Sequence, residues 1–157
     1  MDCLLIGGAQ SVGKSETIYR LTENLIAAGY LVTAGTFPAT FTDFRVVLQG
    51  PNRFGKTVNI IINSPTDTVD IINDFKSFFD ANGTYDILIS SIRDVNFWPR
   101  GDFFRIMGIT SPKDFILEIP LAKITRRDTN FPIALNWYQR QMDNLMNHLL
   151  VNTPFNL

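Results

Sequence analysis

Short apolar runs alternate with amphipathic segments along most of the chain. Short apolar runs bounded by turn-forming residues predict buried strands, whereas apolar residues repeated every three or four positions predict helices. We therefore expect strands at residues 3–6, 30–34, 44–48, 58–62, 85–90 and 115–119. Helices are expected at residues 14–28, around an apolar face from Ile71 to Phe79, between the last two strands, and at residues 133–151.

The order of these elements favours one α/β domain. Gly, Pro and Asn separate the strands at 44–48 and 58–62, which predicts a hairpin there. Elsewhere strands and helices alternate, as in sheets whose strands are joined by crossover helices. We expect a single domain over residues 1–157, built as a three-layer α/β/α sandwich with a mostly parallel sheet.

The segment from Gly8 to Ser15, between the first predicted strand and the first predicted helix, carries the clearest chemical signal. It fits the Walker A pattern G-x-x-x-x-G-K-[ST] at every specified position. Glycines let the backbone N–H groups turn inward, and the start of a helix adds positive potential, so such a loop suits phosphate. Lys14 is expected to reach the β- and γ-phosphates, and Ser15 to ligate Mg²⁺. The expected nucleotide-binding residues are Gly8, Ala9, Gln10, Ser11, Val12, Gly13, Lys14, Ser15 and Glu16.

This strand, loop and helix resemble the P-loop nucleoside triphosphatase superfamily. The resemblance is specific over roughly residues 1–35 and extends to the rest of the chain only in outline. It implies a P-loop NTPase-like fold and a Mg²⁺-dependent site for ATP or GTP. The alternative is an ordinary glycine-rich turn whose lysine points into solvent.

Candidate metal-binding groups follow two other predicted strands, because ligands of open α/β sheets bind beyond the carboxyl ends of strands. Asn63 and Thr66 stand where the Ras-like class of the superfamily has an aspartate and a glycine. Asp94, after the strand at 85–90, can replace the missing carboxylate. The candidate metal groups are therefore Ser15, Asn63 and Asp94. The structural alternatives are that Asn63 ends a strand, that Thr66 or Asp67 caps the next helix, and that Asp94 pairs with Arg93 or water.

Two adjacent arginines, Arg126 and Arg127, complete the catalytic candidates with Lys14 and Asp94. The segment Thr125-Arg126-Arg127-Asp128 is similar to the guanine-reading segment of GTPases. As an arginine pair after a late strand, it also resembles the lid of small nucleotide kinases, where arginines hold transferring phosphates. Ordinary surface charge is the alternative.

Composition narrows the partners and the compartment. The net charge is −1 and 18% of residues are charged, which argues against a general attraction to nucleic acid or anionic lipid. No apolar run has the length needed to span a membrane, and the one cysteine, Cys3, favours a reducing compartment. We expect a cytoplasmic protein with a nucleoside triphosphate as ligand.

These expectations define one leading function and two alternatives. The leading one is a Mg²⁺-dependent ATP-binding P-loop NTPase, with slow basal hydrolysis because Asn63 and Thr66 replace an aspartate and a glycine. One alternative is a small kinase that transfers the γ-phosphoryl group to a nucleotide or metabolite acceptor, held by Arg93, Arg100, Arg126 and Arg127. The other is a nucleotide-dependent binding module with little turnover and a possible protein partner.

Overall fold

The computed structural model describes residues 1–124 and 131–157, which form a six-stranded sheet and four helices. The strands are β1 (Asp2–Gly7), β2 (Leu31–Gly35), β3 (Arg45–Pro51), β4 (Thr57–Asn63), β5 (Ile87–Ser91) and β6 (Phe115–Pro120). The helices are α1 (Lys14–Ala27), α2 (Val69–Ala81), α3 (Pro99–Met107) and α4 (Phe131–Leu150). The strand order is β2-β3-β4-β5-β1-β6.

The sheet is mixed, so the expectation of a mostly parallel sheet is wrong. Strands β4, β5, β1 and β6 run parallel, whereas β3 is antiparallel to both of its neighbours. The connection from β3 to β4 is too short for a crossover, because parallel neighbours need a dozen or more connecting residues. The turn is closed by Asn52, whose side-chain oxygen accepts hydrogen bonds from the N–H groups of Phe54 and Lys56. The predicted hairpin is confirmed.

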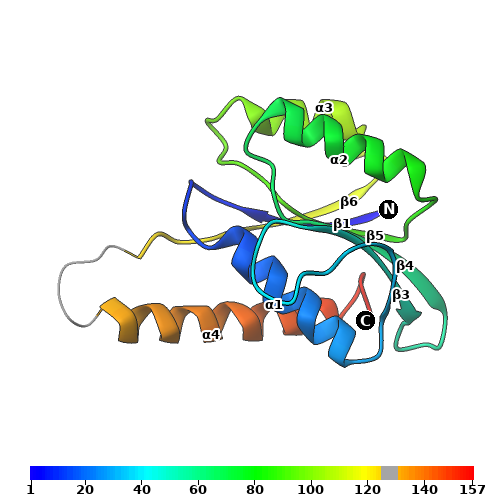
Figure 1. The fold of residues 1–157 in the computed structure, drawn as a ribbon, viewed down its shortest axis with the longest axis horizontal. Helices are drawn as coiled ribbons and strands as arrows, with labels where there is room; N and C mark the ends of the chain where they lie inside the picture. The colour runs from blue at the N-terminus through cyan, green and yellow to red at the C-terminus, as the bar shows by residue number, and fades with distance from the viewer. Residues whose placement is uncertain (125–130) are drawn as a thin grey trace.

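Helices cover both faces of the sheet, as the three-layer prediction required. Helices α1 and α4 lie on one face, and α2 and α3 lie on the other (Figure 1). The alternation of side chains along β1 serves both layers. Leu4 and Ile6 belong to the core beneath α1 and α4, and Cys3 and Leu5 to the core beneath α2 and α3.

Helix α3 lies between β5 and β6, where the sequence predicted a helix but did not indicate its first and last residues. Pro99 occupies its first turn, a position that tolerates the missing N–H group. Phe103 is fully buried, and Gly108 ends the helix in the left-handed conformation with φ 66°. None of the helices in the described ranges is both long and apolar enough to cross a membrane.

Candidate nucleotide-binding site

The segment from Gly8 to Ser15, called the glycine loop below, joins the carboxyl end of β1 to α1. Gly8 and Gly13 have φ angles of 136° and 91°, conformations that favour glycine. A Cβ atom at Gly8 would also lie 3.1 Å from a methyl group of Val12 and 3.2 Å from the Leu121 carbonyl oxygen. The sequence requirement for glycine at the start of the loop therefore has both a conformational and a packing cause.

Helix α1 presents its positive end to the loop. Its first intrahelical bond runs from the N–H group of Thr17 to the Gly13 carbonyl at 2.9 Å. The N–H groups of residues 14–16 precede that bond and have no carbonyl partner within the helix, as at any helix start. Together with the helix dipole, they make this end of the loop suitable for an anion.

Lys14 folds back over the glycine loop instead of pointing into solvent. Its Nζ atom donates to the carbonyl oxygens of Gly8 and Ala9 at 3.0 and 2.7 Å, and the residue is only 7% exposed. Burial, followed by the charge of Arg93, lowers the pKa of Lys14. Asp67 and Asp94 act in the opposite direction. The ammonium group is thus held in a place where an added anion would stabilise it.

Ser15 connects the loop to the carboxyl end of β4. Its hydroxyl group donates to the Ser64 carbonyl at 3.1 Å. The Ser64 hydroxyl in turn donates to Asp43 at 3.2 Å and accepts from the N–H group of Phe44 at 2.8 Å. The first turn of α1, the end of β4 and the start of β3 are therefore joined by one chain of polar contacts.

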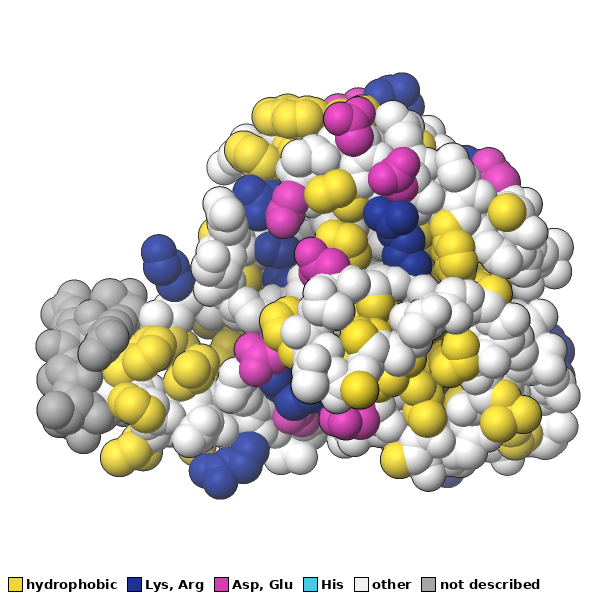
Figure 2. Space-filling view, viewed as in Figure 1, with side chains coloured by type: hydrophobic (Ala, Val, Ile, Leu, Met, Phe, Trp, Pro, Cys, Tyr) yellow, Lys and Arg dark blue, Asp and Glu magenta, His cyan; other side chains and the backbone are white. Residues whose placement is uncertain are grey.

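A cleft of about 470 Å³ opens beside the glycine loop. This volume lies within the range of small-molecule sites. One part of its wall is polar and includes Gln10, Lys14 and Ser15. Another part, which includes Leu135 and Met142 of α4, is apolar. Hydrophobic side chains gather over the first turns of α4 in the space-filling view (Figure 2).

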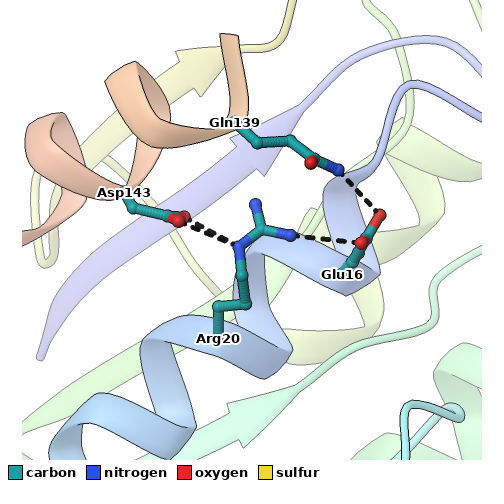
Figure 3. Close-up of polar contacts among 4 residues, drawn as sticks. All are labelled: Glu16, Arg20, Gln139 and Asp143. Carbon is teal, nitrogen blue, oxygen red and sulfur yellow. Dashed lines mark hydrogen bonds and ion pairs between the residues drawn. The ribbon is translucent and has the colours of Figure 1, made fainter. Parts of the chain in front are cut away.

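Helix α4 is tied to α1 by a polar cluster of four side chains at the edge of this cleft (Figure 3). The Nε atom of Arg20 lies 3.0 Å from both carboxylate oxygens of Asp143, and its Nη1 atom lies 3.3 Å from Glu16. Gln139 donates to the other oxygen of Glu16 at 3.3 Å. Glu16, a predicted nucleotide-binding residue, therefore lines the cleft but is engaged by α1 and α4 side chains.

Arg93 and Asp67 meet on the polar side of the cleft, which both residues line. Arg93 is only 8% exposed, and its Nη1 atom lies 2.9 Å from Oδ1 of Asp67. The guanidinium also covers the ring of Phe97, at 4.6 Å from the centroid.

The sequence favoured a helix cap or a solvated helix face for Asp67 over a metal site shared with Asp70 and Asp74. The cap is Thr68, whose hydroxyl accepts from the N–H group of Ile71. The position of Asp67 shortly after β4 was the signal that could have placed it at the site, because ligands of open α/β sheets bind beyond the carboxyl ends of strands.

Neither predicted metal-binding residue beyond Ser15 lines the cleft. The Asn63 side chain is fully buried: its oxygen accepts from Arg45, and its nitrogen donates to the Pro65 carbonyl and the Ser90 hydroxyl. Asp94 is exposed, and its carboxylate accepts from the N–H group of Val95 at 3.1 Å.

The arginines proposed to hold an acceptor are not brought together. Arg100 forms a bidentate ion pair with Glu118 and does not line the cleft. The hydrogen bond with Glu118 is the largest cause of its raised pKa. Arg126 and Arg127, the two predicted catalytic arginines, lie outside the described residues. Of this set, only Arg93 lines the cleft within residues 1–124 and 131–157.

Comparison with known proteins adds no assignment: no protein-family model, curated protein or solved structure matches this chain.

Proposed function

We propose that this chain is a Mg²⁺-dependent ATP-binding P-loop NTPase with slow basal hydrolysis. The observation that supports the proposal most is the conformation of the glycine loop. It curls at the carboxyl end of β1, with Lys14 and Ser15 on the wall of a cleft large enough for a small-molecule ligand. Ligands of open α/β sheets bind at this end of the strands.

The residues present suit a triphosphate and its metal ion. The N–H groups at the start of α1 would bind phosphate oxygens, and Lys14 would exchange its carbonyl partners for phosphate oxygens. The Ser15 hydroxyl would leave the Ser64 carbonyl and ligate Mg²⁺, which neutralises phosphate charge when bound. A buried nitrogen of Arg93, Nη1, has no hydrogen-bond partner among the described residues, which also favours an anionic ligand.

Slow hydrolysis is expected because the cleft, in the part of the chain that the structure describes, offers few carboxylates that are free to act on the attacking water or the metal ion. Among the described residues that line it, Glu16 and Asp67 carry carboxylates, and the oxygens of Glu16 are engaged by Arg20 and Gln139. Asn63 supplies an amide where the Ras-like class has an aspartate, and this amide is buried and does not line the cleft. Hydrolysis requires water to attack the γ-phosphorus while the bond to the β-phosphate oxygen breaks and a proton leaves the water. A carboxylate whose oxygens are engaged by other side chains is not free to orient the attacking water, and a neutral amide is a weaker anchor for hydrated Mg²⁺ than a carboxylate.

The apolar part of the cleft keeps a second function open, that of a small P-loop kinase. Phe41 and two residues of α4, Leu135 and Tyr138, supply apolar and aromatic surface to the cleft. Aromatic and aliphatic side chains of this kind pack against planar or apolar ligand groups. If an acceptor bound there, it would replace water as the group that attacks the γ-phosphorus, and ADP would leave in both reactions.

One assay separates these functions from a binding module. The protein is incubated with Mg²⁺ and ATP, with and without a panel of nucleoside monophosphates, and the binding of ATP and of GTP is measured separately by calorimetry. A low but steady release of phosphate supports the NTPase, and transfer that depends on an acceptor supports the kinase. Binding without turnover supports the binding module. Absence of ATP and GTP binding would refute all three.

A further inference from the structure

The ion pair between Asp67 and Arg93 is incomplete in its hydrogen bonding. Nη1 of Arg93 and Oδ1 of Asp67 are 2.9 Å apart, yet Nη1 has no hydrogen-bond partner within the described part of the chain. The distance is that of an ion pair, but the orientation of the groups does not meet hydrogen-bond geometry. A buried guanidinium nitrogen left in this state lacks much of the stabilisation that a well-placed anion would provide.

The two partners differ in their freedom to move. Arg93 is 8% exposed and packs on Phe97, so its guanidinium is held in place. The Asp67 side chain is 54% exposed, and it lies between β4 and the cap residue of α2. Because solvent can hydrate a carboxylate that is half exposed, Asp67 can leave Arg93 at a modest cost, whereas the buried guanidinium stays in place and then needs another anion as its partner.

The charges around the cleft also favour an additional anion. The positive charge of Arg93 acts on Lys14, which lines the same cleft after the neighbouring strand β1, and the two cations repel one another. Asp67 compensates both of them only in part, because its charge is screened by solvent. A phosphoryl group has several oxygens and more than one negative charge. It can accept hydrogen bonds from both Lys14 and Arg93, so it is a better partner for the two cations than a single carboxylate.

We propose that Asp67 occupies, in the ligand-free cleft, the place at Arg93 that a phosphoryl group of the nucleotide takes on binding. Nucleotide binding then exchanges one anion for another, and Arg93 becomes a phosphate-binding residue. This inference rests on the proposed function, and it adds that Asp67 competes with the ligand. Replacing Asp67 should therefore strengthen phosphate binding, which is the opposite of what a ligand-binding or purely structural carboxylate would do.

The test measures the binding of ATP and of inorganic tripolyphosphate by calorimetry, in EDTA so that no metal takes part. Asp67→Asn is expected to bind both probes about twofold to fivefold more tightly than wild type, the value of a partly exposed ion pair. Arg93→Gln is expected to bind both about tenfold or more weakly, because it loses charge-assisted hydrogen bonds to phosphate. In the double variant, the gain from Asp67→Asn should disappear, since the carboxylate has no Arg93 to occupy.

Asp70→Asn is the matched control, because Asp70 is exposed in the first turn of α2 and does not line the cleft. It should change affinity less than twofold, since exposed charges are screened by salt. Arg93 is buried, so circular dichroism must show that Arg93→Gln is folded. The Asp67→Asn arm does not depend on that variant.

The outcomes separate this inference from the proposed function. Wild-type protein that binds ATP, with an Asp67→Asn variant that binds no more tightly or shows the same gain as Asp70→Asn, would overturn the exchange alone. A gain for ATP without a gain for tripolyphosphate would also overturn it, because the phosphoryl groups would not be the cause. Wild-type protein that binds neither probe, with or without Mg²⁺, would refute the proposed function itself.

Discussion

Replacing Lys14 with methionine tests the glycine loop most directly, because methionine keeps the unbranched apolar stem and removes only the charge. In the structure, the Lys14 ammonium already makes two hydrogen bonds, to the carbonyl oxygens of Gly8 and Ala9. Binding a triphosphate would exchange these two bonds for two bonds to phosphate oxygens. What matters for affinity is therefore the difference between the two kinds of bond.

The size of this difference can be worked out from the two bonds. A hydrogen bond to a charged group contributes about 1.5–3 kcal/mol, and we assign the lower value to the carbonyl bonds and the upper value to the phosphate bonds. The exchange then contributes about 3 kcal/mol, so Lys14→Met should weaken ATP binding about 150-fold. Calorimetry with Mg²⁺-ATP measures this loss. Lys56→Met is the control, since Lys56 is an exposed lysine paired with Asp86 away from the cleft.

Stability should change much less than affinity in the same variant. The loss of two hydrogen bonds is opposed by the relief of burying an ammonium group, so the free energy of unfolding should change by no more than about 2 kcal/mol. A folded Lys14→Met variant that binds ATP within fivefold of wild type would refute the phosphate-binding role of Lys14. A variant that fails to fold would refute the estimate that the two stability effects nearly cancel.

The pH dependence of stability provides a second readout. Burial lowers the pKa of Lys14 below its ordinary value of 10.5, so the unfolded chain binds this proton more tightly than the folded protein does. In the pH range between the folded and unfolded pKa values, stability therefore rises with pH. Wild type should gain stability relative to Lys14→Met as the pH approaches 10.5, as measured by urea denaturation. A stability difference that does not vary in this range would show that Lys14 is not desolvated.

Three other variants test the remaining candidates. Asp94→Asn should change Mg²⁺-dependent turnover less than about twofold, because Asp94 is exposed and outside the cleft wall; a larger loss in a steady-state assay would return it to the site. Asn63→Asp should lower the free energy of unfolding by about 1–3 kcal/mol without raising the basal rate, since it removes a buried donor to the Pro65 carbonyl. An accelerated reaction would instead place Asn63 beside the metal. Arg20→Ala should cost about 1 kcal/mol of unfolding free energy, and a double-mutant cycle with Asp143→Ala would show whether the ion pair is responsible.

Local patterns in the sequence predicted most of the strands and helices, because their signals lie within a few neighbouring residues. The short apolar run at residues 3–6 predicted a buried strand, and in the structure Leu4 and Ile6 face one core while Cys3 and Leu5 face the other. The glycines at positions 8 and 13 marked a loop that needs unusual backbone angles, and both angles are positive in the structure. Such signals depend on backbone geometry and solvation, which the chain carries locally.

The sheet order and the state of the site depended on contacts between distant segments. Strand β5 lies between β1 and β4, and Asn63 at the end of β4 is fully buried, with its amide engaged by Arg45, Pro65 and Ser90. Asp67 meets Arg93 only because β4 and β5 are neighbours in the sheet. A side chain's partners and burial are set by which strands pair, and pairing reflects the packing of the whole chain. Local sequence therefore placed the glycine loop between β1 and α1, and the packing of distant segments decided which charges surround it.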